Sequence, residues 1–156
     1  MKTLVLYDSV YGNTEEIGKA ICEGLTGEIN ILRIDEVKHS DLKSLDLLIV
    51  GSPVHGGRPT LDLEEFLKTI PPGSLKNVRV AAFDTRFAAE DHGIGIRILI
   101  SVIRYAAERI AKTLKQKGGK LVVKPEGFIV KNKEGPLKEG ELERARAWAE
   151  KILSVR

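Results

Sequence analysis

The chain has 156 residues, of which 42% are hydrophobic and 30% are charged, and its formal net charge is +3. This is the size and composition of one folded domain, so we expect a single domain over residues 1–156. The single cysteine excludes an intramolecular disulfide and an all-cysteine metal site. A charge so close to balance favours no nucleic-acid partner.

The sequence shows no pattern typical of an export signal, because polar residues follow directly after the short apolar start. The most apolar stretch, residues 94–107, is too short to cross a bilayer and contains Arg97 and Arg104. We therefore expect a cytoplasmic protein without a membrane span.

Apolar runs alternate along the chain with apolar residues at helical spacing. The runs predict strands at residues 3–7, 29–34, 47–50 and 78–83, and a fifth strand region at 120–123 and 128–130 that Pro125 interrupts. The helical spacing predicts helices around residues 17–25, 61–70, 95–117 and 142–152. This alternation indicates an α/β fold with a parallel sheet and helices on both faces.

Ligands of such sheets bind at the carboxyl ends of the strands, which directs attention to residues 8–14, 51–60 and 84–91. The first of these loops contains short polar side chains and Gly12, and a helix follows it. Free amides at a helix start can hold a phosphate without a cationic side chain. A strand-to-helix turn capped by Asn13 or Thr14 is the alternative interpretation.

The loop sequence Ser-Val-Tyr-Gly-Asn-Thr at residues 9–14 resembles the phosphate loop of flavodoxins, with Tyr11 in place of the usual middle threonine. Three further segments resemble that family in the right order: residues 46–59, residues 83–86, and residues 126–137 before an acidic helix. The resemblance covers essentially the whole chain. It implies a flavodoxin-like three-layer sandwich, of the short-chain type, with a five-stranded parallel sheet in the order 2-1-3-4-5.

The resemblance also implies non-covalent binding of flavin mononucleotide (FMN) and transfer of single electrons between redox partner proteins. The phosphate would be held by Ser9, Val10, Tyr11, Gly12, Asn13 and Thr14. Along the flavin ring would lie Ser52, Pro53, Val54, His55, Gly56 and Gly57, with Asp84, Thr85, Arg86 and Phe87 at its other edge or face. Flavin reduction protonates N5, and the Gly56–Gly57 peptide is a permissive place for a flip that offers its carbonyl there.

The chain also departs from the family pattern. The loops at 51–60 and 84–91 contain neither the tryptophan nor the tyrosine that stack on the ring in many flavodoxins, which leaves Val54, His55 and Phe87 as candidates. Arg58 would place a fixed positive charge near the ring and favour the anionic reduced flavin. Tyr105 and Cys22 are interpreted as structural residues.

Two questions stay open at this level. The predicted helix around residues 94–107 is apolar nearly all round, which suggests a second buried face, such as a homodimer contact. The function could also be that of an FMN-dependent NAD(P)H:quinone-type oxidoreductase on the same fold. A phospho-acceptor receiver fits poorly, because Asp8 has no second acid beside it and the third strand ends in Gly51-Ser52. A module that has lost its flavin fits poorly with the retained phosphate loop.

Overall fold

The computed structural model describes residues 1–87 and 105–155. A parallel sheet occupies its centre, with the strand order β2-β1-β3-β4-β5, so the predicted order is confirmed. The four long strands are β1 (Lys2–Tyr7), β2 (Glu28–Arg33), β3 (Leu47–Pro53) and β4 (Arg79–Arg86). β3 and β4 are almost wholly buried, as expected for strands that are covered on both faces.

The fifth strand region is divided into two short strands, β5 (Lys120–Leu121) and β6 (Glu126–Ile129). β5 pairs with the start of β4 and β6 pairs with its end, both in parallel. The break between them contains Pro125, whose ring removes a donor from the ladder. The end of β4 therefore has β3 on one side and β6 on the other.

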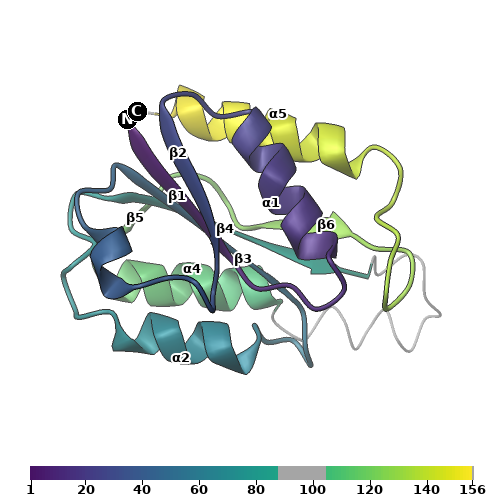
Figure 1. The fold of residues 1–156 in the computed structure, drawn as a ribbon, viewed down its shortest axis with the longest axis horizontal. Coiled ribbons are helices and arrows are strands. Elements are labelled where there is room, and N and C mark those ends of the chain that lie inside the picture. The colour runs from purple at the N-terminus through teal and green to yellow at the C-terminus, as the bar shows by residue number, and fades with distance from the viewer. Residues whose placement is uncertain (88–104, 156) are drawn as a thin grey trace.

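Helices cover both faces of the sheet and complete three layers (Figure 1). On one face lie α1 (Asn13–Glu23) and α5 (Glu141–Ser154), and on the other lie α2 (Leu61–Thr69) and α4 (Ala106–Gln116). A short 3-10 helix, η1 (His39–Leu42), was not predicted. Of the helix expected over residues 95–117, the described part begins at Ala106, and residues 95–104 lie outside the described residues.

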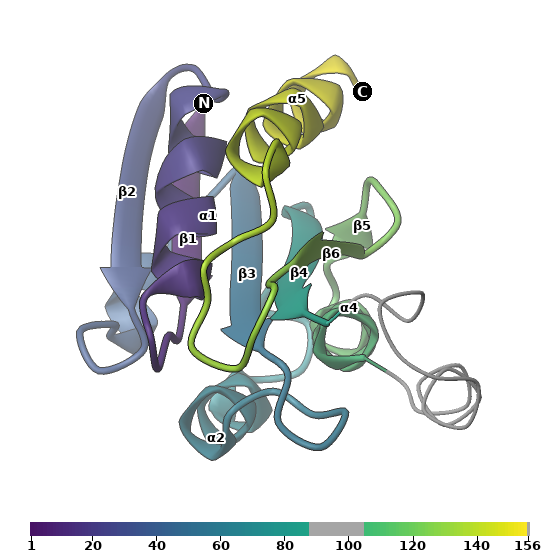
Figure 2. The same ribbon diagram turned by 90° about the vertical axis from the view of Figure 1, so that its right-hand side faces the viewer.

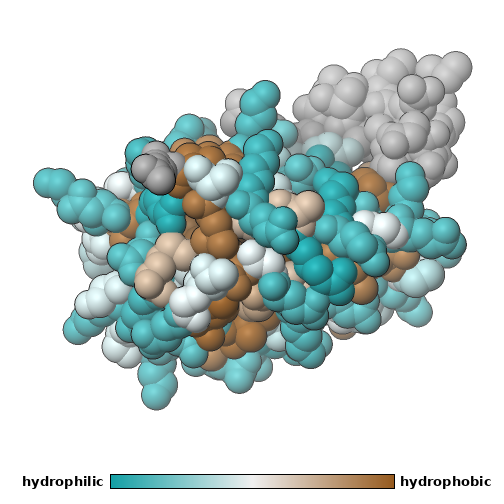
Figure 3. Space-filling view, turned by 90° about the horizontal axis from the view of Figure 1, so that it is seen from above, coloured by the Kyte–Doolittle hydropathy of each residue, from teal (hydrophilic) through white to brown (hydrophobic). Residues whose placement is uncertain are grey.

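The two helical layers each enclose a hydrophobic core. One core packs α2 and α4 against the sheet, and the other packs α1 and α5 against the opposite face around Phe83, Phe128 and Trp148. These three rings meet edge to face, with centroids 6.0–6.1 Å apart. On the side of α1 and α5, a hydrophobic strip crosses a mainly hydrophilic surface (Figure 3). No helix among residues 1–87 and 105–155 is long and apolar enough to cross a membrane.

Candidate functional site

A cavity of about 670 Å³ lies at the carboxyl ends of β1, β3 and β4. In Figure 2 the arrowheads of β3 and β4 mark this end, in the lower part of the view. Its walls come from five parts of the chain, namely the loop after β1, the loop after β3, the end of β4, the start of α4 and the segment between β6 and α5. The lining residues are Ser9, Val10, Tyr11, Asn13, Thr14, Pro53, Val54, His55, Gly56, Gly57, Thr85, Arg86, Phe87, Tyr105, Val130 and Lys133. The cavity thus joins the three loops that the sequence singled out.

The loop between β1 and α1 presents backbone amides at the start of the helix. Gly12 is the N-cap with φ 95°, a backbone conformation that glycine adopts without strain. The Ser9 hydroxyl accepts a hydrogen bond from the Gly12 amide (3.0 Å). The first helical bond runs from the Glu16 amide to the Gly12 carbonyl, and among the described residues no side chain caps the amides of Asn13, Thr14 and Glu15 that come before it. Such a set of free donors fits a phosphate group.

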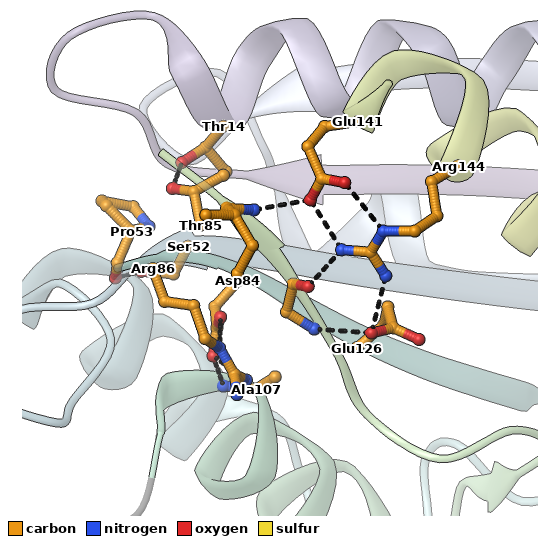
Figure 4. A network of polar contacts seen from close by, with 12 residues as sticks. Thr14, Ser52, Pro53, Asp84, Thr85, Arg86, Ala107, Glu126, Glu141 and Arg144 are labelled. Atoms are coloured by element: carbon orange, nitrogen blue, oxygen red, sulfur yellow. Dashed lines mark hydrogen bonds and ion pairs between the residues drawn. The ribbon is translucent and has the colours of Figure 1, made fainter. Parts of the chain in front are cut away.

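Thr14 joins this loop to the end of β4. Its hydroxyl lies 2.9 Å from that of Thr85, and both residues line the cavity while being almost fully buried (Figure 4). Either hydroxyl can be the donor. If Thr85 donates, the Thr14 proton is left for an acceptor in the cavity. The pair can therefore present one directed donor to a bound anion.

Asp8 holds the loop between β1 and α1 in place, a role that the sequence analysis missed. Its carboxylate accepts hydrogen bonds from the Ser9 amide (2.8 Å) and the Thr60 hydroxyl (2.6 Å), and it is only 7% exposed. The Arg33 guanidinium donates to the Ser9 carbonyl (2.8 Å) and lies 3.6 Å from the Asp8 carboxylate. Asp8 thus links the loop after β1 to the residue that precedes α2.

The loop after β3 closes in a tight turn at His55–Arg58. Two backbone hydrogen bonds join these residues, and the central Gly56 and Gly57 have φ of 58° and 78°. Positive φ at both central positions is the pattern of a type I′ turn. The Val54 amide donates to the Thr85 carbonyl (3.3 Å), so this loop is also attached to β4.

The end of β4 alternates between the two faces of the sheet. Thr85 points toward α1, whereas Asp84 and Arg86 point toward α4 (Figure 4). Asp84 and Arg86 form a bidentate ion pair with contacts of 2.6 and 2.9 Å. The Ala107 amide at the start of α4 donates to the same carboxylate (2.9 Å). Burial raises the pKa of Asp84, and the hydrogen bonds from Arg86 and Ala107 act in the opposite direction.

Three of the sixteen residues expected at the site do not line the cavity. Ser52 and Asp84 are fully buried. The Ser52 hydroxyl is used within the fold, where it accepts from the Thr60 amide and donates to the Pro53 carbonyl. Gly12 is absent from the lining, and it shapes the loop through its positive φ at the N-cap of α1. Strand alternation explains Asp84, because neighbouring residues of β4 must face opposite sides.

Arg58 does not hold the position that the sequence suggested. It is absent from the lining, its side chain is 57% exposed, and it lies 3.8 Å from Glu64. The cationic side chains that reach the cavity are instead Arg86 and Lys133, and the lining named above contains no carboxylate.

Tyr105, Val130 and Lys133 line the cavity although the sequence analysis did not place them there. Tyr105 was interpreted as structural, but its ring lies 3.6 Å from the Arg86 guanidinium. Lys133 and Val130 belong to the segment after β6, which passes beside the start of α1 (Figure 2). A side chain at Gly135 would there collide with Asn13. Only the three-dimensional arrangement brings these distant segments together.

Apart from Met1, the most exposed large apolar side chains among the described residues lie in the segments that follow β1, β3 and β4. Val10, Tyr11 and Phe87 line the cavity with 54%, 46% and 38% exposure, and Leu61 begins α2 with 72% exposure. In the described part of the chain, no group of histidine, cysteine or acidic side chains is arranged to hold a metal ion.

Comparison with known proteins agrees with this geometry. The sequence model of the flavodoxin domain family matches residues 4–129 of this chain. A flavodoxin of Clostridium saccharobutylicum is 26% identical over 161 residues, covering 99% of this chain and 96% of its own. A flavodoxin of Aquifex aeolicus is 33% identical over 73 residues, covering 44% of this chain and 40% of its own. Oxidised flavodoxin 2 of Bacillus cereus has the same fold, with a TM-score of 0.75 at 22% identity and 98% coverage of both chains. The chain belongs to the flavodoxin family.

Proposed function

We propose that the protein binds FMN non-covalently in the cavity and carries single electrons between redox partner proteins. The observation that supports this most directly is the composition of the cavity. One part offers the uncapped amides of α1 and the hydroxyls of Ser9 and Thr14, which suit a phosphate. The other part offers apolar side chains and the Gly56–Gly57 turn, which suit a flat heterocycle.

When bound, FMN supplies a group that accepts and releases electrons one at a time. The protein residues bind it, orient it and keep water from one side of it. Asp8 and Arg33 hold the phosphate loop in place, and Thr85 directs the Thr14 hydroxyl. The Gly56–Gly57 peptide lies in the tight turn after β3, where its carbonyl would accept a hydrogen bond from the protonated ring nitrogen of the flavin.

The rim of the cavity supports a role in contact with other proteins. Val10, Tyr11 and Phe87 are exposed apolar residues that line the cavity, and aromatic residues are favoured in protein interfaces. The homodimer expectation concerned residues 94–107, of which 94–104 lie outside the described residues. Ala106 and Ala107 are fully buried within the fold.

The test is to add FMN to the purified protein and reduce it stepwise without oxygen while recording visible absorbance. Tight binding followed by a stable one-electron-reduced stage supports the carrier function. Direct two-electron reduction, with turnover of NADH or NADPH and a quinone, favours the NAD(P)H:quinone-type oxidoreductase instead. Absence of FMN binding refutes both functions.

A further inference from the structure

The cavity contains a cationic side chain whose position is fixed by three different contacts. Arg86 is bound by both oxygens of Asp84, at 2.6 and 2.9 Å. Its guanidinium lies over the ring of Tyr105, 3.6 Å from the centroid. It also packs on the backbone of Gly127 in β6, where any side chain would collide with it. A guanidinium held in this way is a rigid charge, not a mobile surface group.

The charges of the pair are not equally placed with respect to the cavity. Arg86 lines the cavity and its side chain is 19% exposed, whereas the Asp84 side chain is 0% exposed and does not line it. The carboxylate therefore lies behind the guanidinium. A ligand in the cavity meets the positive end of this pair first.

The remaining described walls do not offset that charge. The lining includes a second cation, Lys133, and none of the lining residues is aspartate or glutamate. Arg58 faces Glu64 outside the lining. In the part of the chain that the structure describes, the electrostatic field in the cavity favours a ligand form that carries more negative charge.

We infer that Arg86 sets the redox preference of the bound flavin by stabilising its anionic, fully reduced form relative to the oxidised form. This inference rests on the proposed binding of FMN. Oxidised flavin takes up two electrons and one proton, which binds at N5, so that one negative charge remains on the ring between N1 and the C2 carbonyl. A fixed guanidinium at the cavity wall attracts this form more strongly than the neutral oxidised ring.

The experiment compares the two-electron midpoint potential of FMN bound to variants, measured by titration with dithionite against a reference dye. In the double variant Asp84→Asn/Arg86→Gln both charges are removed and a polar pair is retained. We expect it to bind reduced FMN about tenfold less tightly relative to oxidised FMN, which lowers the potential by about 30 mV. Arg86→Lys keeps the positive charge, so its midpoint potential should differ from that of the unmodified protein by less than a third of that shift. Arg58→Gln is the matched control, since it removes an exposed arginine outside the lining, and its potential should equal that of the unmodified protein.

The inference is wrong if the double variant has the potential of the unmodified protein, or if Arg58→Gln lowers the potential as much as the double variant does. Circular dichroism checks that each variant folds. If the polar double variant does not fold, Asp84→Leu/Arg86→Met replaces the pair by apolar side chains of similar size, which buried ion pairs often tolerate. If the unmodified protein binds no FMN, the proposed function fails and this inference fails with it. If it binds FMN and only the shift is absent, the proposed function stands and the role of Arg86 is refuted.

Discussion

The Thr14–Thr85 hydroxyl pair gives a prediction that separates direct from indirect contacts with a phosphate. Each hydroxyl has one proton, and the two oxygens are 2.9 Å apart. With FMN bound, we expect Thr85 to donate to Thr14 and Thr14 to donate to the phosphate. Thr14→Val then removes a hydrogen bond to a charged group, which costs about 1.5–3 kcal/mol. The Kd for FMN should rise roughly 10- to 150-fold.

Thr85→Val removes only the bond between two neutral hydroxyls, which costs about 0.5–1.5 kcal/mol, and should raise the Kd by roughly two- to tenfold. We expect Thr85 to act on the phosphate only through Thr14. The double variant should therefore bind FMN about as weakly as Thr14→Val alone, and the two effects should not add. Both residues are almost fully buried, and valine has nearly the shape of threonine, so the double variant should fold.

Quenching of flavin fluorescence on binding measures each Kd, and riboflavin serves as the control ligand because it lacks the phosphate. Thr14→Val should leave the riboflavin Kd nearly unchanged. An equal loss for riboflavin and FMN would show that Thr14 shapes the cavity and does not contact the phosphate. Additive effects of the two substitutions would show that the hydroxyls act separately.

Three further predictions concern the folded state. Gly51→Ala should lower the free energy of unfolding by about 1–3 kcal/mol in urea titrations, because the added methyl group would overlap the buried ring of Phe83, and Gly51→Ala/Phe83→Leu should recover part of the loss. Cys22 should react slowly with iodoacetamide at pH 8 and much faster in urea, because burial raises the pKa of its thiol to about 11; equal rates would contradict this. Burial of Glu141 acts to raise its pKa, but hydrogen bonds from Arg144 and a backbone amide outweigh it and hold the pKa below 4.5. The stabilisation from Glu141 is then present above pH 4.5 and is lost as pH falls through the lower folded-state pKa, so Glu141→Gln should flatten the pH dependence of thermal unfolding in that acid range.

The sheet and the position of the cavity could be predicted because their signals are local. The first four residues of β3 form a continuous apolar run, and that pattern is typical of a strand buried on both faces. The loops after β1, β3 and β4 follow from the rule that ligands bind at carboxyl ends. The side on which Asp84 lies was also present in the sequence, since alternation along β4 puts it opposite Thr85. That signal was overlooked.

The contacts that hold the site together could not be predicted, because they join residues far apart in the chain. Asp8 bonds Thr60 across 52 positions, and Arg33 reaches Ser9 across 24. Lys133 enters the cavity because its segment lies against the start of α1, which no local pattern indicates. The presence of an arginine in a predicted loop also did not indicate whether its side chain reaches the cavity. Arg58 and Arg86 both follow the end of a predicted strand, but only Arg86 lines the cavity.

The division of the fifth strand region also affects when the site can form during synthesis. The part of β4 that carries Thr85 and Arg86 pairs with β6, and Arg144 of α5 fastens β6 through Glu126 and the Gly127 carbonyl. A nascent chain emerges from the ribosome amino end first. The loops after β1, β3 and β4 therefore leave the ribosome well before β6, which supports the end of β4. The nascent protein can fold its first strands early, but it gains a competent cavity only after α5 has emerged.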